Sequence, residues 1–281
     1  MLPTMSRSLI VTILIGTILL SATGCQFNRQ FAPITPGHVF SNELGRRGIV
    51  AKEQGDLAEA ERQLEDAVKW NKNNINHRLN FAEVLWKQGR HQESLYQLNE
   101  AVKRGGQDDA SLHISLAEKY LEIREYTIAE RHANEAVRLA PQNHRSWALR
   151  GQARYMRATL RPGDPSEQSL ATLREAREDY IRAVSLAPNN STDSALLMGL
   201  ANVQMRCGQP EQALATWLTA QRLYQQGNEP YEILVGKMET LAMLQRFNEA
   251  ETTLATIRQR GLEIPGMEQR LQETMIATRR Q

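Results

Sequence analysis

Two rows of mostly short side chains run through this chain in step, and they constrain its fold more than any other feature. Both rows advance by 34, 35, 47, 37 and 37 residues. Two helices can cross closely only where the side chains between them are short, so such a row marks a helix–helix contact. Two rows that move together indicate a helix pair that occurs six times. The first row is Ala60, Ser94, Ala129, Ala176, Ala213 and Ala250; the second is Ala67, Ala101, Ala136, Ala183, Ala220 and Ile257.

The stretch 110–143 is the clearest copy of this unit. Apolar residues at helical spacing predict one amphipathic helix around Ile114–Leu121 and another around Ile128–Val137. Pro141 ends the pair, because proline cannot continue a helix. The pattern resembles the tetratricopeptide repeat (TPR), a helix–turn–helix of 34 residues. The resemblance implies an all-α fold: a right-handed α-solenoid of about six such repeats plus a C-terminal capping helix.

The predicted domain organisation follows from these rows. Good helix formers dominate the composition, and no stretch reads as a β-strand. After the last repeat, Met267, Leu271 and Met275 form one apolar stripe at 265–281, as a terminal capping helix requires. The solenoid is expected at 41–264, with repeats at about 41–74, 75–108, 110–143, 144–190, 194–227 and 231–264.

Residues 1–24 are predicted to be an export signal. Arg7 precedes an apolar run, Leu9–Leu20, that is too short to span a bilayer comfortably. The sequence LSATGC at 20–25 resembles the lipobox of bacterial lipoproteins, which implies cleavage before Cys25 and acylation of that residue. Two or three acyl chains would hold the protein on a membrane, where one chain anchors only marginally. A plain secretory signal is the alternative, because Ala22-Thr23-Gly24 is also an acceptable cleavage site.

The next segment, 25–40, is interpreted as a short irregular tether, with an uncleaved N-terminal helix as the alternative. Gln26 follows the cysteine. In Gram-negative lipoproteins an aspartate at that position favours the inner membrane, so a glutamine there points to the outer membrane. The resemblance therefore implies a location in the cell envelope, with a lipid anchor in the outer membrane and the protein facing the periplasm.

Repeat four is longer than the others. Its seam residues arrive thirteen positions late, although Trp147 is on time, so the extra length lies between its two helices. Asp164-Pro165-Ser166-Glu167 is typical of a helix start, and a second helix is expected from Pro165 to about Ala187. We expect both helices to be lengthened and to project from the solenoid edge. These two helices carry charged residues that could either form solvated ion pairs with one another or form a docking site for a partner, and both interpretations remain open. The residues are Arg150, Arg154, Arg157 and Arg161 on the first helix and Glu167, Glu175, Glu178 and Asp179 on the second.

The sequence carries no recognisable catalytic or metal-binding constellation. Neither HExxH, CxxC, GxSxG nor a phosphate-binding glycine loop is present. His113 and His132 share a repeat, but nothing completes a metal site with them. Cys207 reads as a small, partly buried hydrophobe. A net charge of +2 is no footprint for nucleic acid. We therefore expect no enzyme activity, no cofactor, no metal and no small-molecule substrate.

The resemblance also implies a concave face lined by the first helix of each repeat. In this chain that face is apolar and rich in methionine, with scattered charges, which suits an amphipathic helix or an extended apolar peptide. The alternative is that several of these residues pack against neighbouring helices and offer no groove. The expected protein-binding residues are Leu79, Glu83, Trp86, Ile114, Glu118, Leu121, Gln152, Tyr155, Met156, Met198, Asn202 and Met205.

These observations predict a lipid-anchored TPR adaptor or scaffold that binds protein partners during assembly of an envelope complex, such as a pilus, a secretion channel or cell-wall machinery. A soluble secreted binding module is the first alternative. A non-catalytic subunit of an envelope enzyme is the second.

Overall fold

A computed structural model describes residues 36–160, 167–188, 193–224 and 228–261, together with Gly266, Gln269, Glu273 and Ile276. The predicted signal, Cys25 and the tether up to residue 35 lie outside the described residues, as does most of the predicted capping helix. Within the described ranges the regular structure is entirely helical, with twelve α-helices and one short 3₁₀ helix. The predicted all-α fold is confirmed.

The chain forms two compact units that divide between Arg104 and Gly105. Unit 1 holds α2 (Pro36–Glu53), α3 (Leu57–Trp70), α4 (Ile75–Lys87) and α5 (His91–Lys103). Unit 2 holds η2 (Gly106–Asp108), α6 (Ala110–Glu122), α7 (Tyr126–Leu139), α8 (His144–Thr159), α9 (Glu167–Leu186), α10 (Ser194–Arg206), α11 (Pro210–Arg222), α12 (Tyr231–Met243) and α13 (Phe247–Gln259). Among the described residues, none of these helices is both long and apolar enough to cross a bilayer.

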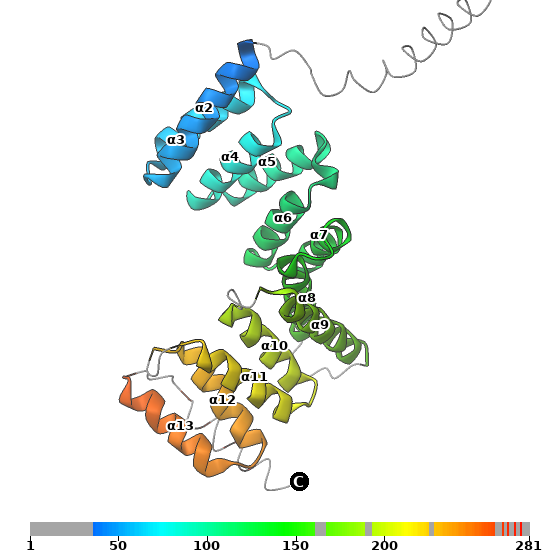
Figure 1. Ribbon diagram of the computed structural model, residues 1–281, viewed down its shortest axis with the longest axis vertical. Coiled ribbons are helices and arrows are strands. Elements are labelled where there is room, and N and C mark those ends of the chain that lie inside the picture. Colours follow the sequence, from blue (N-terminus) through cyan, green and yellow to red (C-terminus); the bar gives the residue numbers. More distant parts are fainter. Residues whose placement is uncertain are drawn as a thin grey trace, which may run out of the picture. The chain divides into compact units, whose positions relative to one another are not determined.

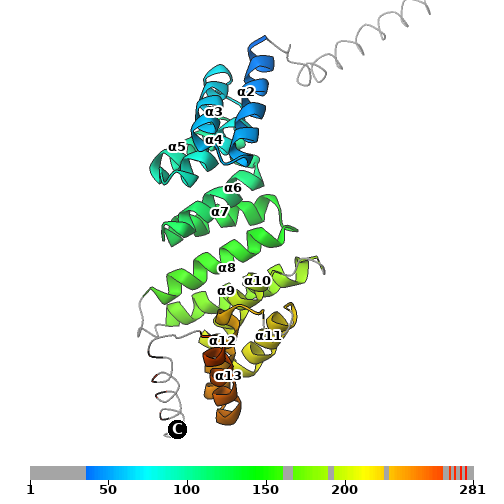
Figure 2. The ribbon, with the colours of Figure 1, turned by 90° about the vertical axis from the view of Figure 1, so that its left-hand side faces the viewer.

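Helix pairs stack in chain order within each unit. In unit 1, α3 packs against α2 and α4, and α4 packs against α5 (Figure 1). In unit 2 the pairs α6–α7, α8–α9, α10–α11 and α12–α13 follow one another, and Figure 2 shows the first two as successive layers. The first helices α6, α8, α10 and α12 also contact one another in sequence. This is the arrangement of an α-solenoid, in which each repeat touches only its neighbours.

The two predicted rows form the contact seam. All twelve residues of the rows are 0% exposed, from Ala60 to Ile257. The polar member, Ser94, donates a hydrogen bond from Oγ to the carbonyl of Ala82 at 2.6 Å, so its burial leaves no unpaired hydroxyl. The seam prediction is confirmed, and the close helix crossings explain why eleven of the twelve positions hold alanine or serine.

Helix ends follow their sequence signals. The side chains of Asp56, Asn74, Asp109, Asn143 and Asp193 accept hydrogen bonds from the first backbone N–H groups of the helices that follow them. The helix α2 begins at Pro36, a residue suited to the first helical turn, so the predicted tether is five residues too long. The second helix of repeat four begins at Glu167 among the described residues.

Candidate functional site

The first helices of repeats four and five enclose a concavity of about 580 Å³ in unit 2. Helix α8 contributes Ala148, Gln152, Tyr155 and Met156 to its wall, and α10 contributes Leu196, Met198 and Asn202. Asp193, His144 and Arg145 lie at its edge, where α8 and α10 begin. The wall is thus mainly apolar and aromatic, with polar groups that could orient a bound chain.

A second concavity of about 440 Å³ lies between α6 and α8. Glu118, Leu121 and Glu122 line it from α6, while Arg145 and Gln152 of α8 belong to both concavities. A guanidinium nitrogen of Arg145 lies 2.5 Å from a carboxylate oxygen of Glu118. This ion pair joins the edges of the two concavities, so their lining residues form one continuous face.

The floor of the larger concavity depends on one tyrosine. Tyr180, on α9, is 6% exposed, and burial raises the pKa of its phenol. A Cβ placed on Gly199 would lie 2.5 Å from the ring, and one on Gly151 would lie 3.1 Å from it. Both helices that line the concavity therefore approach the tyrosine through a residue without a side chain.

The structure brings together seven of the twelve predicted groove residues in these concavities. They come from three consecutive first helices, as the resemblance implied. Whether they bind a partner stays a prediction. The seven are Glu118, Leu121, Gln152, Tyr155, Met156, Met198 and Asn202.

Two of the predicted groove residues pack against neighbouring helices instead of lining a concavity. Ile114 is 7% exposed and packs with Ala117, Ala133 and Leu149 in the core, because its position on α6 faces α7 and α8 rather than the concave side. Met205 packs on the buried cluster around Trp217, and its sulfur accepts a hydrogen bond from Thr240 at 3.1 Å. Both contacts fit the alternative that several of these side chains pack against neighbouring helices.

The remaining three predicted groove residues lie on α4 of unit 1. Glu83 forms ion pairs with Lys52 at 2.6 Å and Lys87 at 3.8 Å. The ring of Trp86 stacks on His91 with centroids 4.1 Å apart, and Leu79 is half-buried. A protein-binding role for Leu79, Glu83 and Trp86 stays a prediction.

Sequence reasoning missed the residues beneath the groove. Tyr180 and Gly199 were not predicted to be important, although the sequence repeats this pair of an aromatic residue and a glycine. Trp217 and Gly236 follow them at the same 37-residue step, and a Cβ on Gly236 would lie 2.2 Å from the Trp217 ring. The glycine–aromatic contact is therefore a repeated feature of this half of unit 2.

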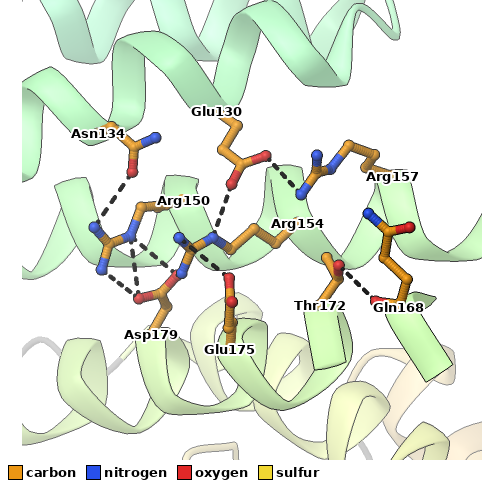
Figure 3. A network of polar contacts seen from close by, with 9 residues as sticks. All are labelled: Glu130, Asn134, Arg150, Arg154, Arg157, Gln168, Thr172, Glu175 and Asp179. Atoms are coloured by element: carbon orange, nitrogen blue, oxygen red, sulfur yellow. Dashed lines mark hydrogen bonds and ion pairs between the residues drawn. The ribbon is translucent and has the colours of Figure 1, made fainter. Parts of the chain in front are cut away.

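Repeat four holds a buried ion network, drawn in Figure 3. Arg150 donates to both carboxylate oxygens of Asp179, with the shortest contact at 2.6 Å, and Arg154 donates to Asp179 at 2.8 Å. Arg154 also contacts Glu130 of α7 at 2.9 Å and Glu175 at 3.4 Å, and Arg157 contacts Glu130 at 3.1 Å. The network thus joins α7, α8 and α9.

This network corrects one prediction and confirms another. The helices α8 and α9, of 16 and 20 residues, are longer than the 13 or 14 of most others, as expected. The central ion pairs are not solvated, however, since the side chains of Asp179, Arg150 and Arg154 are only 3%, 16% and 17% exposed; Arg157 and Glu175, at the margin of the network, are 40% and 58% exposed. Burial raises the pKa of the Asp179 carboxyl, but the bonds from Arg150 and Arg154 oppose that shift. These arginines bind within the repeat, which argues against a docking site built on them.

Two other charged residues of repeat four, and Cys207, complete the comparison with the sequence-based predictions. Arg161 lies outside the described residues, and Glu178 pairs with Arg177 rather than with the arginines of α8. Cys207 is half-buried against the cluster around Leu200, and burial raises the pKa of its thiol, which fits a structural role.

Two histidines of repeat three lie in direct contact. The Nδ1 atoms of His113 and His132 are 3.1 Å apart, and His113 Nε2 lies 3.2 Å from the carbonyl of Gln107. Tyr120 stacks on the His132 ring. Within the described part of the chain, no three His, Cys, Asp or Glu side chains are grouped so as to hold a metal ion.

Comparison with protein families identifies tetratricopeptide repeats at residues 51–113 and 194–219. Comparison with curated proteins finds no match. Among solved structures, pilF of Pseudomonas aeruginosa superposes with a TM-score of 0.63 and 13% identity, over 86% of this chain and 100% of its own. MamA from Desulfovibrio magneticus RS-1 gives 0.57 and 17%, over 70% of this chain and 100% of its own.

A third similar structure is a thermophilic TPR protein of Thermus thermophilus, TTC0263, with a TM-score of 0.52 and 18% identity, over 72% of this chain and 99% of its own. At such identities the likeness concerns the fold alone. The fold is that of a TPR solenoid.

Proposed function

We propose that this protein is a non-enzymatic adaptor of the bacterial envelope, anchored by lipid on Cys25, which binds a protein partner on the face formed by α6, α8 and α10. The occupant best suited to that face is an amphipathic helix or an extended apolar segment. Assembly of a pilus, a secretion channel or cell-wall machinery is the proposed setting.

The concavity between α8 and α10 carries this proposal. Tyr155, Met156 and Met198 provide apolar, adaptable walls, and methionine repacks around different side chains at low cost. Gln152 and Asn202 are exposed beside them and can bond to a peptide backbone. A volume of about 580 Å³ accepts several side chains of a peptide.

Support for the anchor comes from the sequence. The lipobox-like LSATGC places Cys25 after an apolar run and a small–small pair.

Site-specific photocrosslinking tests the binding face. A photoreactive residue at Tyr155 or Met198 should capture a discrete partner in cells, while one at Ile181, an exposed apolar position on α9, should not. Met198→Glu should abolish capture from Tyr155, because it places a charge in the apolar wall. Equal capture from all three positions would contradict a binding site in the concavity.

Mass analysis of the mature N-terminus tests the anchor. We expect the chain to start at Cys25 with acyl chains attached, and Cys25→Ala to shift the protein from the membrane fraction to the soluble fraction. A mature chain with an unmodified Cys25 would support the soluble secreted module instead.

A further inference from the structure

One end of unit 1 exposes an aromatic patch. Phe40, near the start of α2, and Trp70, the last residue of α3, meet edge to face with ring centroids 5.2 Å apart. Their exposed fractions are 49% and 58%, and Val39 beside them is 59% exposed. Packing the two rings together therefore leaves about half of each in water, which costs hydrophobic free energy unless something covers them.

The same end of unit 1 is basic. Helices alternate in direction, so the starts of α2 and α4 lie beside the ends of α3 and α5. The first turns of α2 and α4 carry no acidic residue, while the last turns of α3 and α5 carry Lys69 and Lys103. Lys72 and Arg104 follow these helices, and Arg104 contacts Asn73 at 3.2 Å, which places both helix ends together.

The carboxylates that pair with these cations lie one helical turn earlier in α3 and α5, and thus further from this end of unit 1. Lys69 pairs with Glu65 and Asp66, and Lys103 and Arg104 pair with Glu100, each from the preceding turn of the helix. The side chains of Lys69 and Lys103 are 60% and 72% exposed, against 50%, 46% and 16% for Glu65, Asp66 and Glu100, so the cations reach further into solvent at this end than the carboxylates do. The opposite end of the unit differs, since there Glu59 and Glu93 in the first turns of α3 and α5 accompany Lys52 and Lys87 in the last turns of α2 and α4.

The chain enters unit 1 at this patch. The helix α2 begins at Pro36, only eleven residues after Cys25. Eleven extended residues reach at most about 40 Å. A lipid on Cys25 would hold the patch within that distance of the bilayer, where an effective concentration on the order of millimolar lets even a weak surface contact form.

We propose that this end of unit 1, which carries Val39, Phe40 and Trp70 together with the cations Lys69, Lys72, Lys103 and Arg104, is a membrane-contact surface that lies against an anionic bilayer. Tryptophan and phenylalanine partition into the headgroup region, and each nearby cation adds attraction to anionic lipids. The proposal rests on the lipid anchor proposed above for proximity, and it adds how the folded domain meets the bilayer.

Fluorescence of Trp70 tests this surface. The mature chain carrying Cys207→Ala is coupled through Cys25 to a maleimide lipid in vesicles of phosphatidylglycerol and phosphatidylethanolamine with brominated acyl chains. Subtracting the spectrum of a Trp70→Phe variant isolates Trp70 from Trp86, Trp147 and Trp217. We expect a blue shift and about a twofold loss of Trp70 emission by bromine quenching, and a smaller loss with Phe40→Ala.

The matched control is Tyr96→Ala, which removes an aromatic ring of comparable exposure (60%) from the middle of α5 and should leave the quenching unchanged. Unchanged Trp70 emission on coupling would overturn the proposal. So would a blue shift already present before coupling that disappears when the chain starts at Pro36, because residues 25–35 would then be the cover. Chemical coupling supplies the anchor whether or not cells acylate Cys25, so this result is independent of the mass analysis.

Discussion

The ring of Tyr180 occupies the space in which a side chain at Gly199 would stand. A Cβ at that position would lie 2.5 Å from Cε1 and 2.7 Å from the hydroxyl oxygen. The contact brings α9 and α10 together directly beneath the larger concavity. The shape of the proposed binding face therefore depends on the packing of the Tyr180 ring against Gly199, although neither residue is one of the polar groups proposed to bind a partner.

Gly199→Ala should destabilise the protein by about 1–3 kcal/mol, because the added methyl group overpacks a buried ring that has little room to move. Alanine's better helix propensity, about 1 kcal/mol, offsets only part of that cost. Urea unfolding followed by circular dichroism measures the effect. Gly151→Ala, whose new Cβ would lie 3.1 Å from the same ring, is the graded control and should cost less. Equal stability of Gly199→Ala and the parent would show that Tyr180 moves freely.

Arg124→Gly and Gln245→Gly should each stabilise the protein by about 1 kcal/mol. These residues have φ of 64° and 60°, in the left-handed region where a side chain is strained. Gly55, Gly89 and Gly208 take the same conformation in the turns of other repeats. The reverse change, Gly89→Ala, should lower the thermal midpoint although open space surrounds it. A lower midpoint for both glycine variants would contradict this account.

Asp179→Asn should cost about 3–5 kcal/mol, because it leaves the buried guanidinium of Arg150 without a charged partner and removes one of the three carboxylates around Arg154. Glu175→Gln is the control. Its side chain is 58% exposed and contacts Arg154 at only 3.4 Å, so its loss should cost less than about 1 kcal/mol. Hydrogen exchange in α8 and α9 should rise in the first variant alone. Similar losses in both variants would mean that burial of the network is unimportant.

Stability should fall as the pH drops from about 6.5 to 4. Burial, with lesser effects of His113 and Arg131, lowers the pKa of His132 to about 4, while Glu135 opposes the shift. The unfolded chain then binds a proton that the folded chain does not, so the free energy of unfolding is full above pH 6.5 and decreases towards pH 4.

The loss should amount to about 1–3 kcal/mol at pH 4. His132→Phe keeps an aromatic ring beside Tyr120 and should flatten the pH profile over this window. Titration of the His132 ring by NMR checks the assignment. A midpoint near 6.5 would show that the ring is hydrated in solution.

The seam was predictable because it depends on a local and repeated requirement. Each of the twelve positions needs a side chain that fits one helix crossing, and most take a short one, so they appear in the sequence as two rows in register. The lengthened repeat four was predictable for the same reason, since Trp147 stayed in step while Ala176 did not. Seven groove residues followed from their position within the repeat.

The errors arose where two repeats meet. Ile114 was expected in the groove, but the rotation of α6 against α7 and α8 turns it into the core. The arginines of α8 were paired with α9 alone, whereas Glu130 of α7 reaches Arg154 and Arg157 from the preceding repeat. Periodicity within one helix cannot report which side chain of another repeat lies opposite.

The sequence by itself determined the helix pairs, their number and the seam that joins them, because these depend on spacing along one chain and on side-chain size. Only the tertiary structure decided which residues of the first helices face a concavity, which ion pairs are buried, and that Phe40 and Trp70 share one exposed surface. Those outcomes depend on the crossing angle and rotation of neighbouring helices, which are fixed by packing between residues far apart in the sequence.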